Sequence, residues 1–146
     1  MDKENILMRI QDCGIVAVVR AESADKAERI VDACMEGGVA AIELTFSVPH
    51  ADRVIETLSY KYDPKDIILG AGTVMDAATA RIAMLSGAQY IVSPYLDLET
   101  LRMCNRYRVP MMPGVMSVRE AVTAMENGAD ILKIFPGDLF GPKIIK

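Results

Sequence analysis

The chain has 146 residues, a length that suits one domain with a real hydrophobic core. Hydrophobic residues make up 51 % and charged residues 25 %, a balance typical of folded globular proteins that excludes a disordered chain. The net charge of −4 argues against a broad surface for nucleic acid or for an anionic membrane, so we expect neither as a partner.

No apolar stretch approaches membrane-spanning length, and the charged start Met1–Asn5 lacks the apolar core of a signal peptide, which predicts a cytoplasmic location. The cysteines Cys13, Cys34 and Cys104 are odd in number and far apart, so we expect three buried, reduced thiols. The only histidine, His50, has no partner at metal-ligand spacing. We therefore expect neither a metal site nor a cofactor.

Apolar periodicity and end signals predict a regular alternation of helices and strands. Four helices are expected to begin at serine or aspartate N-caps, namely Ser23, Asp76, Asp97 and Ser117. The predicted order is helix 3–12, strand 15–20, helix 23–36, strand 40–46, helix 49–60, strand 66–70, helix 76–86, strand 89–94, helix 97–107, strand 109–114, helix 117–127, strand 130–135, and a helix from Pro142 that is cut off at Lys146.

Successive strands are each separated by about one helix and two short loops, which predicts an α/β fold with a parallel sheet. Periodicity alone leaves a doubly wound sheet and a (β/α)8 TIM barrel open. Polar residues recur where strands end, and a barrel gathers those ends at one mouth, which favours the barrel. We expect residues 1–146 to form a single, incomplete barrel domain made of an N-terminal helix and six βα units. The polar strand-end residues are Arg20, Glu43, Thr45, Thr73, Ser93 and Lys133.

Two charged residues interrupt strands that are otherwise apolar. Lys133 lies within Asp130–Gly137, and Glu43 lies within Ile42–Leu44. Burying an unpaired charge costs several kcal/mol or forces neutralisation. Three interpretations remain open. Lys133 could extend into water, the two residues could form a buried ion pair, or Lys133 could form a Schiff base with a carbonyl substrate while Glu43 carries protons.

The catalytic interpretation is chemically consistent. A lysine amine must lose its proton before it attacks, and desolvation with a neighbouring cation favours the neutral form; Arg20 is a candidate for that cation. The protonated imine then draws electrons from the adjacent carbon, which makes C–C cleavage feasible. A nearby carboxylate is needed to carry protons at the water, the imine and the substrate hydroxyl.

Three further segments are candidates for lining the site. Gly70–Thr73 could bring backbone N–H groups and the Thr73 hydroxyl to a carboxylate or phosphate, although a tight turn explains its glycines equally well. Ser93–Pro94 ends a strand, and a rigid turn is its alternative role. Phe135 could form a pocket wall or pack in the core.

Six ordered motifs together resemble the 2-keto-3-deoxy-6-phosphogluconate (KDPG) aldolase family, also described as 4-hydroxy-2-oxoglutarate (KHG) aldolases. The motifs are Ile15–Arg20, Gly37–Val39 leading to Ile42–Thr45, Gly70–Val74, Ser93–Pro94, Pro113–Gly114 and Leu132–Pro136. Each motif is modest alone, but six in order over almost the whole chain are specific. The resemblance implies a class I aldolase on a (β/α)8 barrel, usually a homotrimer. Such an enzyme cleaves KDPG to pyruvate and glyceraldehyde 3-phosphate, or 4-hydroxy-2-oxoglutarate to pyruvate and glyoxylate.

The resemblance also assigns roles to particular residues. Lys133 matches the Schiff-base lysine and Glu43 the general acid/base. In the segment Gly72–Thr73, Thr73 matches the residue that helps to hold the pyruvate carboxylate, beside the backbone N–H groups. Arg20 matches a basic residue at the end of the first strand. The residues that match pocket walls are Pro94 and Phe135.

The sequence departs from the family pattern in two places. Many members carry an arginine four residues after the glutamate as a clamp for the substrate carboxylate, whereas this chain has Ser47. Ser47 can form hydrogen bonds but brings no charge, so carboxylate binding must rest on Thr73, backbone N–H groups or Arg20. The family also continues through strands seven and eight, whose loops bind phosphate. This chain stops before them, so we expect a fragment of a longer polypeptide.

For the intact polypeptide the sequence favours a pyruvate-forming aldolase that acts on a small 2-keto acid. One alternative is another phosphate-handling (β/α)8 enzyme, which would leave the buried lysine and glutamate unexplained. The other is a catalytically inactive barrel fragment that serves only as an assembly partner. Met111, Met112 and Met116 are expected to fill the core rather than to form an interface.

Overall fold

The computed structural model describes residues 2–145. The helices are α1 (Lys3–Cys13), α2 (Ala24–Glu36), α3 (Ala51–Lys61), α4 (Ala77–Leu85), α5 (Leu98–Arg106), α6 (Val118–Glu126) and the short α7 (Gly137–Phe140), followed by a 3-10 turn, η1 (Pro142–Ile145). The strands are β1 (Val16–Val19), β2 (Ala41–Thr45), β3 (Ile68–Gly72), β4 (Tyr90–Val92), β5 (Met111–Met112), β6 (Gly114–Val115) and β7 (Lys133–Ile134). The predicted caps Ser23, Asp76, Asp97 and Ser117 each accept a hydrogen bond from the backbone N–H three residues further on.

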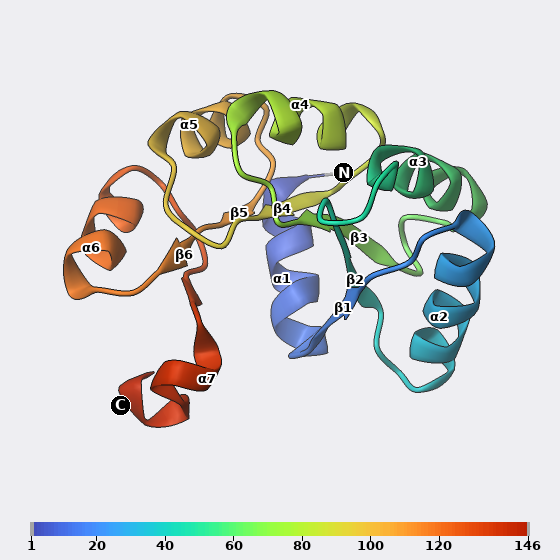
Figure 1. Cartoon of the computed structure of the whole chain (residues 1–146), viewed down its shortest axis with the longest axis horizontal. Helices are drawn as coiled ribbons and strands as arrows, with labels where there is room; N and C mark the ends of the chain where they lie inside the picture. Colours follow the sequence, from blue (N-terminus) through green and yellow to red (C-terminus); the bar gives the residue numbers. More distant parts are fainter. Residues whose placement is uncertain (1, 146) are drawn as a thin grey trace.

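The strands form a parallel arc in chain order. β1 to β5 make one sheet, and β6 pairs with β7 in a second, two-stranded sheet. Sequential order without a reversal is the arrangement of a barrel rather than of a doubly wound sheet. Figure 1 shows helices α2 to α5 along the outer side of the arc and α1 on its inner side. The prediction of parallel βα units of barrel type is confirmed.

Both faces of strands β2 to β5 are buried, with side chains alternating between them, whereas β1 exposes Val18. Ile42, Leu69 and Ile91 point outward into the cluster beneath the outer helices. On the inner face, Ile6 and Ile10 of α1 pack against a second cluster. Burial on both faces explains why the strands read as continuous apolar runs. The strand members of the inner cluster are Ala41, Ile68, Tyr90, Val92 and Met112.

The fifth predicted strand is interrupted. Its first part, β5, pairs with β4, whereas its second part, β6, pairs with β7. Pro113 lies between the two parts and has no backbone N–H to donate to a neighbouring strand. Its carbonyl accepts a hydrogen bond from the backbone N–H of Lys133 at 3.0 Å. The strand that carries Lys133 is therefore attached to the arc through this break.

The ends of the chain and one helix differ from the predictions. Helix α3 begins at Ala51 rather than at residue 49, because His50 adopts the left-handed conformation before it. Helix α7 was not predicted, and the segment from Pro142 forms a 3-10 turn. Met1 and Lys146, which belong to the predicted terminal segments, lie outside the described residues. No helix within residues 2–145 is long and apolar enough to cross a membrane.

Two predictions of burial are partly wrong. All three thiols are free, but only Cys104 is buried, as a member of the cluster beneath the outer helices, whereas Cys34 and Cys13 pack against the margins of the outer and inner clusters and are half-buried. Met111 and Met112 belong to the core, and Met116 does not. Met116 follows β6 in a surface loop and is 55 % exposed.

Candidate active site

Most of the predicted site residues lie at or just after the carboxyl ends of the strands, whereas Glu43 lies in the middle of β2 and Lys133 is the first residue of the short β7. Parallel strands in one arc place these ends at a single edge, which is the mouth of the barrel. The buried members of the set are Glu43 and Gly72, the half-buried ones are Thr73, Pro94 and Lys133, and the exposed ones are Arg20, Ser47 and Phe135.

Glu43 is a carboxylate buried on the inner face of β2, with only 4 % of its surface exposed. Its side chain lies across β3, and a Cβ placed on Gly72 would overlap Glu43 Oε1. Burial raises the pKa of Glu43, while the Lys133 ammonium and the Arg20 guanidinium act in the opposite direction and only partly offset it. A carboxyl with a raised pKa is suited to general acid/base work near neutral pH.

Lys133 opens strand β7 and is half-buried. Its ammonium Nζ lies 5.0 Å from the centroid of the Phe135 ring, a favourable cation–π distance. Its charge also acts on the Glu43 carboxyl, so the two residues share one environment. Phe135 is 39 % exposed and therefore does not pack in the core, which was the alternative to a pocket wall.

The mouth of the barrel contains two local features. Thr73 has a φ of 56°, and a β-branched side chain rarely adopts this left-handed conformation. Such strain persists only where the surroundings impose it, and it is concentrated at functional sites. The hydroxyls of Thr45 and Ser47 share a hydrogen bond of 2.8 Å, in which either oxygen could be the donor. Ser47 is thereby attached to the end of β2.

The glycines of β3 lie within the strand and not in the tight turn that was one of the two interpretations of Gly70–Thr73. The sequence suggested that residues 71–74 form a turn, but β3 continues through Gly72. Gly70 and Gly72 both face the inner side, and each makes room for a side chain from a neighbouring strand. Glu43 of β2 covers Gly72, and the ring of Tyr90 of β4 covers Gly70. Tyr90 lies on the same inner face as Glu43 and was not singled out from the sequence; its signal is a tyrosine opposite an inward glycine of the adjacent strand.

Replacing Gly72 by alanine is expected to displace Glu43 and to destabilise the fold. The new Cβ would overlap the Glu43 carboxyl in a filled interior, and overpacking of this kind costs about 1–3 kcal/mol. Gly137→Ala is the matched control, because nothing lies within 4 Å of a Cβ at that position. Urea unfolding of both variants measures the effect. Equal losses in free energy of unfolding for the two variants would contradict the prediction.

The raised pKa of Glu43 predicts a pH-dependent stability. The folded protein holds this proton more tightly than the unfolded chain, whose reference pKa is 4.5. The stabilising contribution is therefore complete below that pKa and is lost as pH rises through the folded pKa. As pH rises from 4.5, the unaltered protein should lose stability relative to Glu43→Gln, so the difference between their free energies of unfolding should shift in favour of the variant. Urea unfolding at several pH values tests this, and a pH-independent difference would contradict it.

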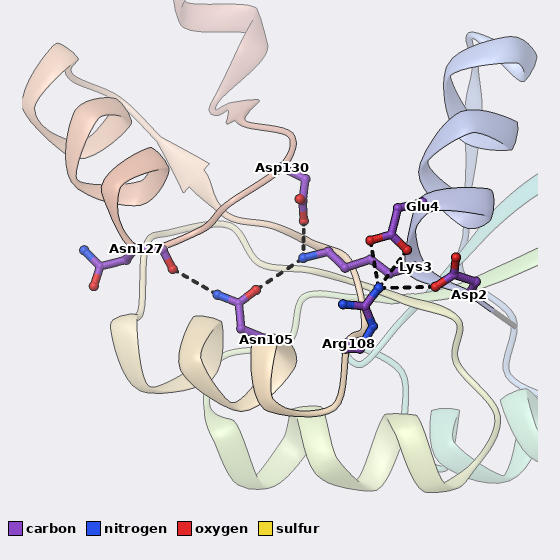
Figure 2. A network of polar contacts seen from close by, with 7 residues as sticks. All are labelled: Asp2, Lys3, Glu4, Asn105, Arg108, Asn127 and Asp130. Atoms are coloured by element: carbon purple, nitrogen blue, oxygen red, sulfur yellow. Dashed lines mark hydrogen bonds and ion pairs between the residues drawn. The ribbon is translucent and has the colours of Figure 1, made fainter.

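A polar network joins α1 to the segment that leads into β7 (Figure 2). Lys3 Nζ lies 2.7 Å from Asp130 and donates to Asn105 Oδ1 at 3.3 Å. Asn105 Nδ2 in turn donates to the carbonyl of Asn127 at 2.9 Å. The side chains of Lys3 and Asp130 are only 13 % and 28 % exposed. The network thus fixes the chain three residues before Lys133.

The ion pair between Lys3 and Asp130 is expected to contribute measurably to stability. A double-mutant cycle with Lys3→Met and Asp130→Asn should give a coupling energy of about 1 kcal/mol, because both groups are largely shielded from water. Arg108 serves as the comparison, since it meets Glu4 at 2.7 Å with both side chains 63 % exposed. Arg108→Ala should cause no measurable loss. A coupling energy of zero for Lys3 and Asp130 would refute the prediction.

Within residues 2–145, no three side chains of His, Cys, Asp or Glu gather in a way that could hold a metal ion. The mouth of the barrel presents the amine of Lys133, the carboxyl of Glu43 and the hydroxyls of Thr73 and Ser47. An amine whose charge acts on a buried carboxyl is compatible with imine chemistry, in which the amine attacks a carbonyl and the carboxyl carries protons.

The parallel βα arc places the chain among α/β proteins of TIM-barrel type. More narrowly, the chain belongs to the KDPG and KHG aldolase family of class I aldolases, because the sequence model described as "Aldolase: KDPG and KHG aldolase" matches residues 6–146. The resemblance seen in the six sequence motifs is thereby confirmed.

Curated relatives agree with this assignment. A 2-dehydro-3-deoxy-6-phosphogalactonate aldolase from Escherichia coli (strain K12) is 35% identical over 132 residues, which cover 90% of this chain and 64% of the relative. A 2-dehydro-3-deoxy-phosphogluconate aldolase from Treponema pallidum (strain Nichols) is 33% identical over 127 residues, which cover 87% of this chain and 60% of the relative. The chain thus spans about three fifths of the length of these relatives.

Solved structures share the fold. The KDPG aldolase of Zymomonas mobilis ATCC 29191 superposes with a TM-score of 0.83 at 27% identity, covering 97% of this chain and 66% of that chain. The Legionella pneumophila KDPG aldolase has a TM-score of 0.79 at 27% identity, covering 85% of this chain and 59% of that chain. In that crystal structure pyruvate was captured at low pH as a covalent carbinolamine intermediate.

Proposed function

We propose that the protein carrying this chain is a Schiff-base aldolase that releases pyruvate from KDPG, from 4-hydroxy-2-oxoglutarate, or from both. The observation that carries the proposal is that the Lys133 ammonium acts electrostatically on the buried Glu43 carboxyl on the interior side of the arc. The second products are glyceraldehyde 3-phosphate and glyoxylate, respectively. Similarity to phosphogluconate and phosphogalactonate aldolases supports a phosphorylated 2-keto-3-deoxy sugar acid as the substrate class.

In the proposed reaction the Lys133 amine attacks the C2 carbonyl carbon of the substrate. The carbinolamine loses water to give a protonated imine, and the C3–C4 bond then breaks with its electron pair moving toward the imine nitrogen. Glu43 takes the proton from the C4 hydroxyl, so the aldehyde leaves and an enamine remains. The enamine takes a proton at C3, and hydrolysis of the imine releases pyruvate and restores the amine.

The remaining site residues are proposed to orient the substrate. Thr73 and the backbone N–H groups from Gly72 onward would hold the pyruvate carboxylate, with Arg20 supplying positive charge at the mouth. Ser47, where many members carry an arginine, would contribute only a hydrogen bond. The proposed walls of the pocket are Pro94 and Phe135.

The proposal also covers the organisation of the protein. Residues 1–146 would form part of one barrel domain, and the active form would be a homotrimer in the cytoplasm. Light scattering of the purified protein tests the oligomeric state.

Trapping of the imine tests the proposed function. The protein is incubated with pyruvate, treated with borohydride, and digested for mass spectrometry. The expected result is a reduced pyruvate adduct on the peptide that contains Lys133. Absence of the adduct in a protein that includes the rest of the barrel would overturn the proposal. An adduct that forms only in that longer protein would identify the chain alone as the inactive fragment.

A further inference from the structure

Tyr90 is a fully buried, titratable side chain on the inner face of the arc, and the proposed reaction does not use it. It is 0 % exposed, and its hydroxyl has no hydrogen-bond partner among the described residues. A buried hydroxyl without a partner loses the hydrogen bonds that it makes in water, so such groups usually bind an ordered water. Its neighbours in the inner cluster are mostly apolar and offer few acceptors.

The direction of the Tyr90 ring follows from the register of the strands. The ring starts on β4 and its Cζ end lies over Gly70 of β3, where a Cβ would overlap it. Gly70 is the register partner of Tyr90 on one side and of Glu43 on the other. The ring therefore spans β3, and the hydroxyl at its tip is directed toward β2, on the interior face that carries Glu43.

The charges around the hydroxyl determine its role as a donor. Burial and the Glu43 carboxylate, with a smaller contribution from Cys13, hold the pKa of Tyr90 well above its ordinary value, so the phenol keeps its proton. Cys13 Sγ already lies 3.2 Å from the carbonyl of Ile15, and sulfur is a weak acceptor. The charged and titratable groups that act on Glu43 or are acted on by it are Lys133 of β7, Arg20 after β1 and Tyr90 of β4.

We propose that Tyr90 is a positioning residue for Glu43, and that one internal water accepts a hydrogen bond from the Tyr90 hydroxyl and donates one to the Glu43 carboxylate. This inference rests on the proposed function, in which Glu43 carries protons. The hydrogen bond from this water would stabilise the ionised form of Glu43 and hold its carboxylate over Gly72, directed toward the mouth of the barrel. Tyr90 itself would not touch the substrate.

Tyr90→Phe tests the inference, because it keeps the ring that fills the space over Gly70 and removes only the hydroxyl. The pKa of Glu43 is measured by NMR titration of protein with 13C-labelled glutamate, and the Glu43 signal is assigned by its loss in Glu43→Gln. Removing a donor to the ionised form should raise that pKa by about half a unit, roughly a threefold gain in proton affinity. Tyr60→Phe is the control, since Tyr60 is 85 % exposed on α3. An unchanged Glu43 titration in Tyr90→Phe would overturn the inference.

Two further measurements keep the inference separate from the proposed function. A high-resolution crystal structure of the unaltered protein should contain a water within hydrogen-bond distance of both Tyr90 Oη and Glu43, and its absence would refute the bridge even if the variant fails to fold. Borohydride trapping of pyruvate on Lys133 should persist in Tyr90→Phe. The rate at which the enzyme exchanges the methyl protons of pyruvate with solvent is measured as a function of pH. The pH at which this rate falls on the acid side should rise by the same amount as the pKa of Glu43. If no pyruvate adduct is trapped in the unaltered protein, the proposed aldolase function is refuted. The NMR titration of Glu43 would still decide the role of Tyr90.

Discussion

Replacing Lys133 by alanine is expected to abolish the borohydride-trapped pyruvate adduct and to reduce aldol cleavage by roughly 10⁴-fold or more. Without the amine no imine forms, and the electron pair of the breaking C3–C4 bond has no acceptor. The adduct is measured by peptide mass spectrometry, and cleavage is measured by coupling pyruvate release to a dehydrogenase.

Two control variants separate the covalent role of Lys133 from its charge. Lys133→Arg keeps a cation near Glu43 and over the Phe135 ring, but a guanidinium does not form the imine, so it should be as inactive as the alanine variant. Lys143→Ala removes an exposed lysine of η1 and should leave the adduct in place. An adduct that survives Lys133→Ala would mean that a different lysine is the nucleophile.

Glu43→Gln should separate imine formation from turnover. Glutamine has nearly the same shape and fits over Gly72, so the Lys133 strand stays in place and pyruvate is still trapped to a large extent. It cannot accept or deliver a proton, and the loss of a general acid/base typically lowers the rate by about 10²–10⁴-fold. Steady-state cleavage and trapping yield are measured side by side.

The matched control for this variant is Glu56→Gln on the exposed side of α3, which should leave both trapping and cleavage unchanged. A cleavage rate that is unaffected by Glu43→Gln would exclude Glu43 as the proton carrier. If trapping and cleavage fell equally, Glu43 would be needed to form the imine rather than only to cleave the aldol.

Local sequence patterns were sufficient to predict the alternation of strands and helices. Apolar runs, serine and aspartate caps and terminal glycines act over a few residues, and each predicted cap forms its hydrogen bond. Lys133 and Glu43 became candidates by the same kind of local evidence, because a charge in an apolar strand needs an explanation.

Features that depend on residues distant in sequence were not predicted. The interruption at Pro113 depends on the different partners of β5 and β6, which the segment itself does not specify. The ion pair between Lys3 and Asp130 joins α1 to the segment that leads into β7. The position of the Tyr90 ring over Gly70 depends on the register in which β3 pairs with β4. Each of these follows only once the register of the strands is known.

Gly70 and Gly72, the two inward-facing glycines of β3, restrict which substitutions the barrel interior can accept among related proteins. β3 contributes no side chain at these positions, so the size and chemistry of the interior there are set by residues of β2 and β4. Positions 70 and 90 should therefore change together among related proteins, with a larger residue at one accompanied by a smaller residue at the other. Position 72 has no such freedom as long as position 43 is a glutamate. Glu43, the proposed proton carrier, thus restricts position 72 of the neighbouring strand to glycine, whereas positions 70 and 90 can change as a pair.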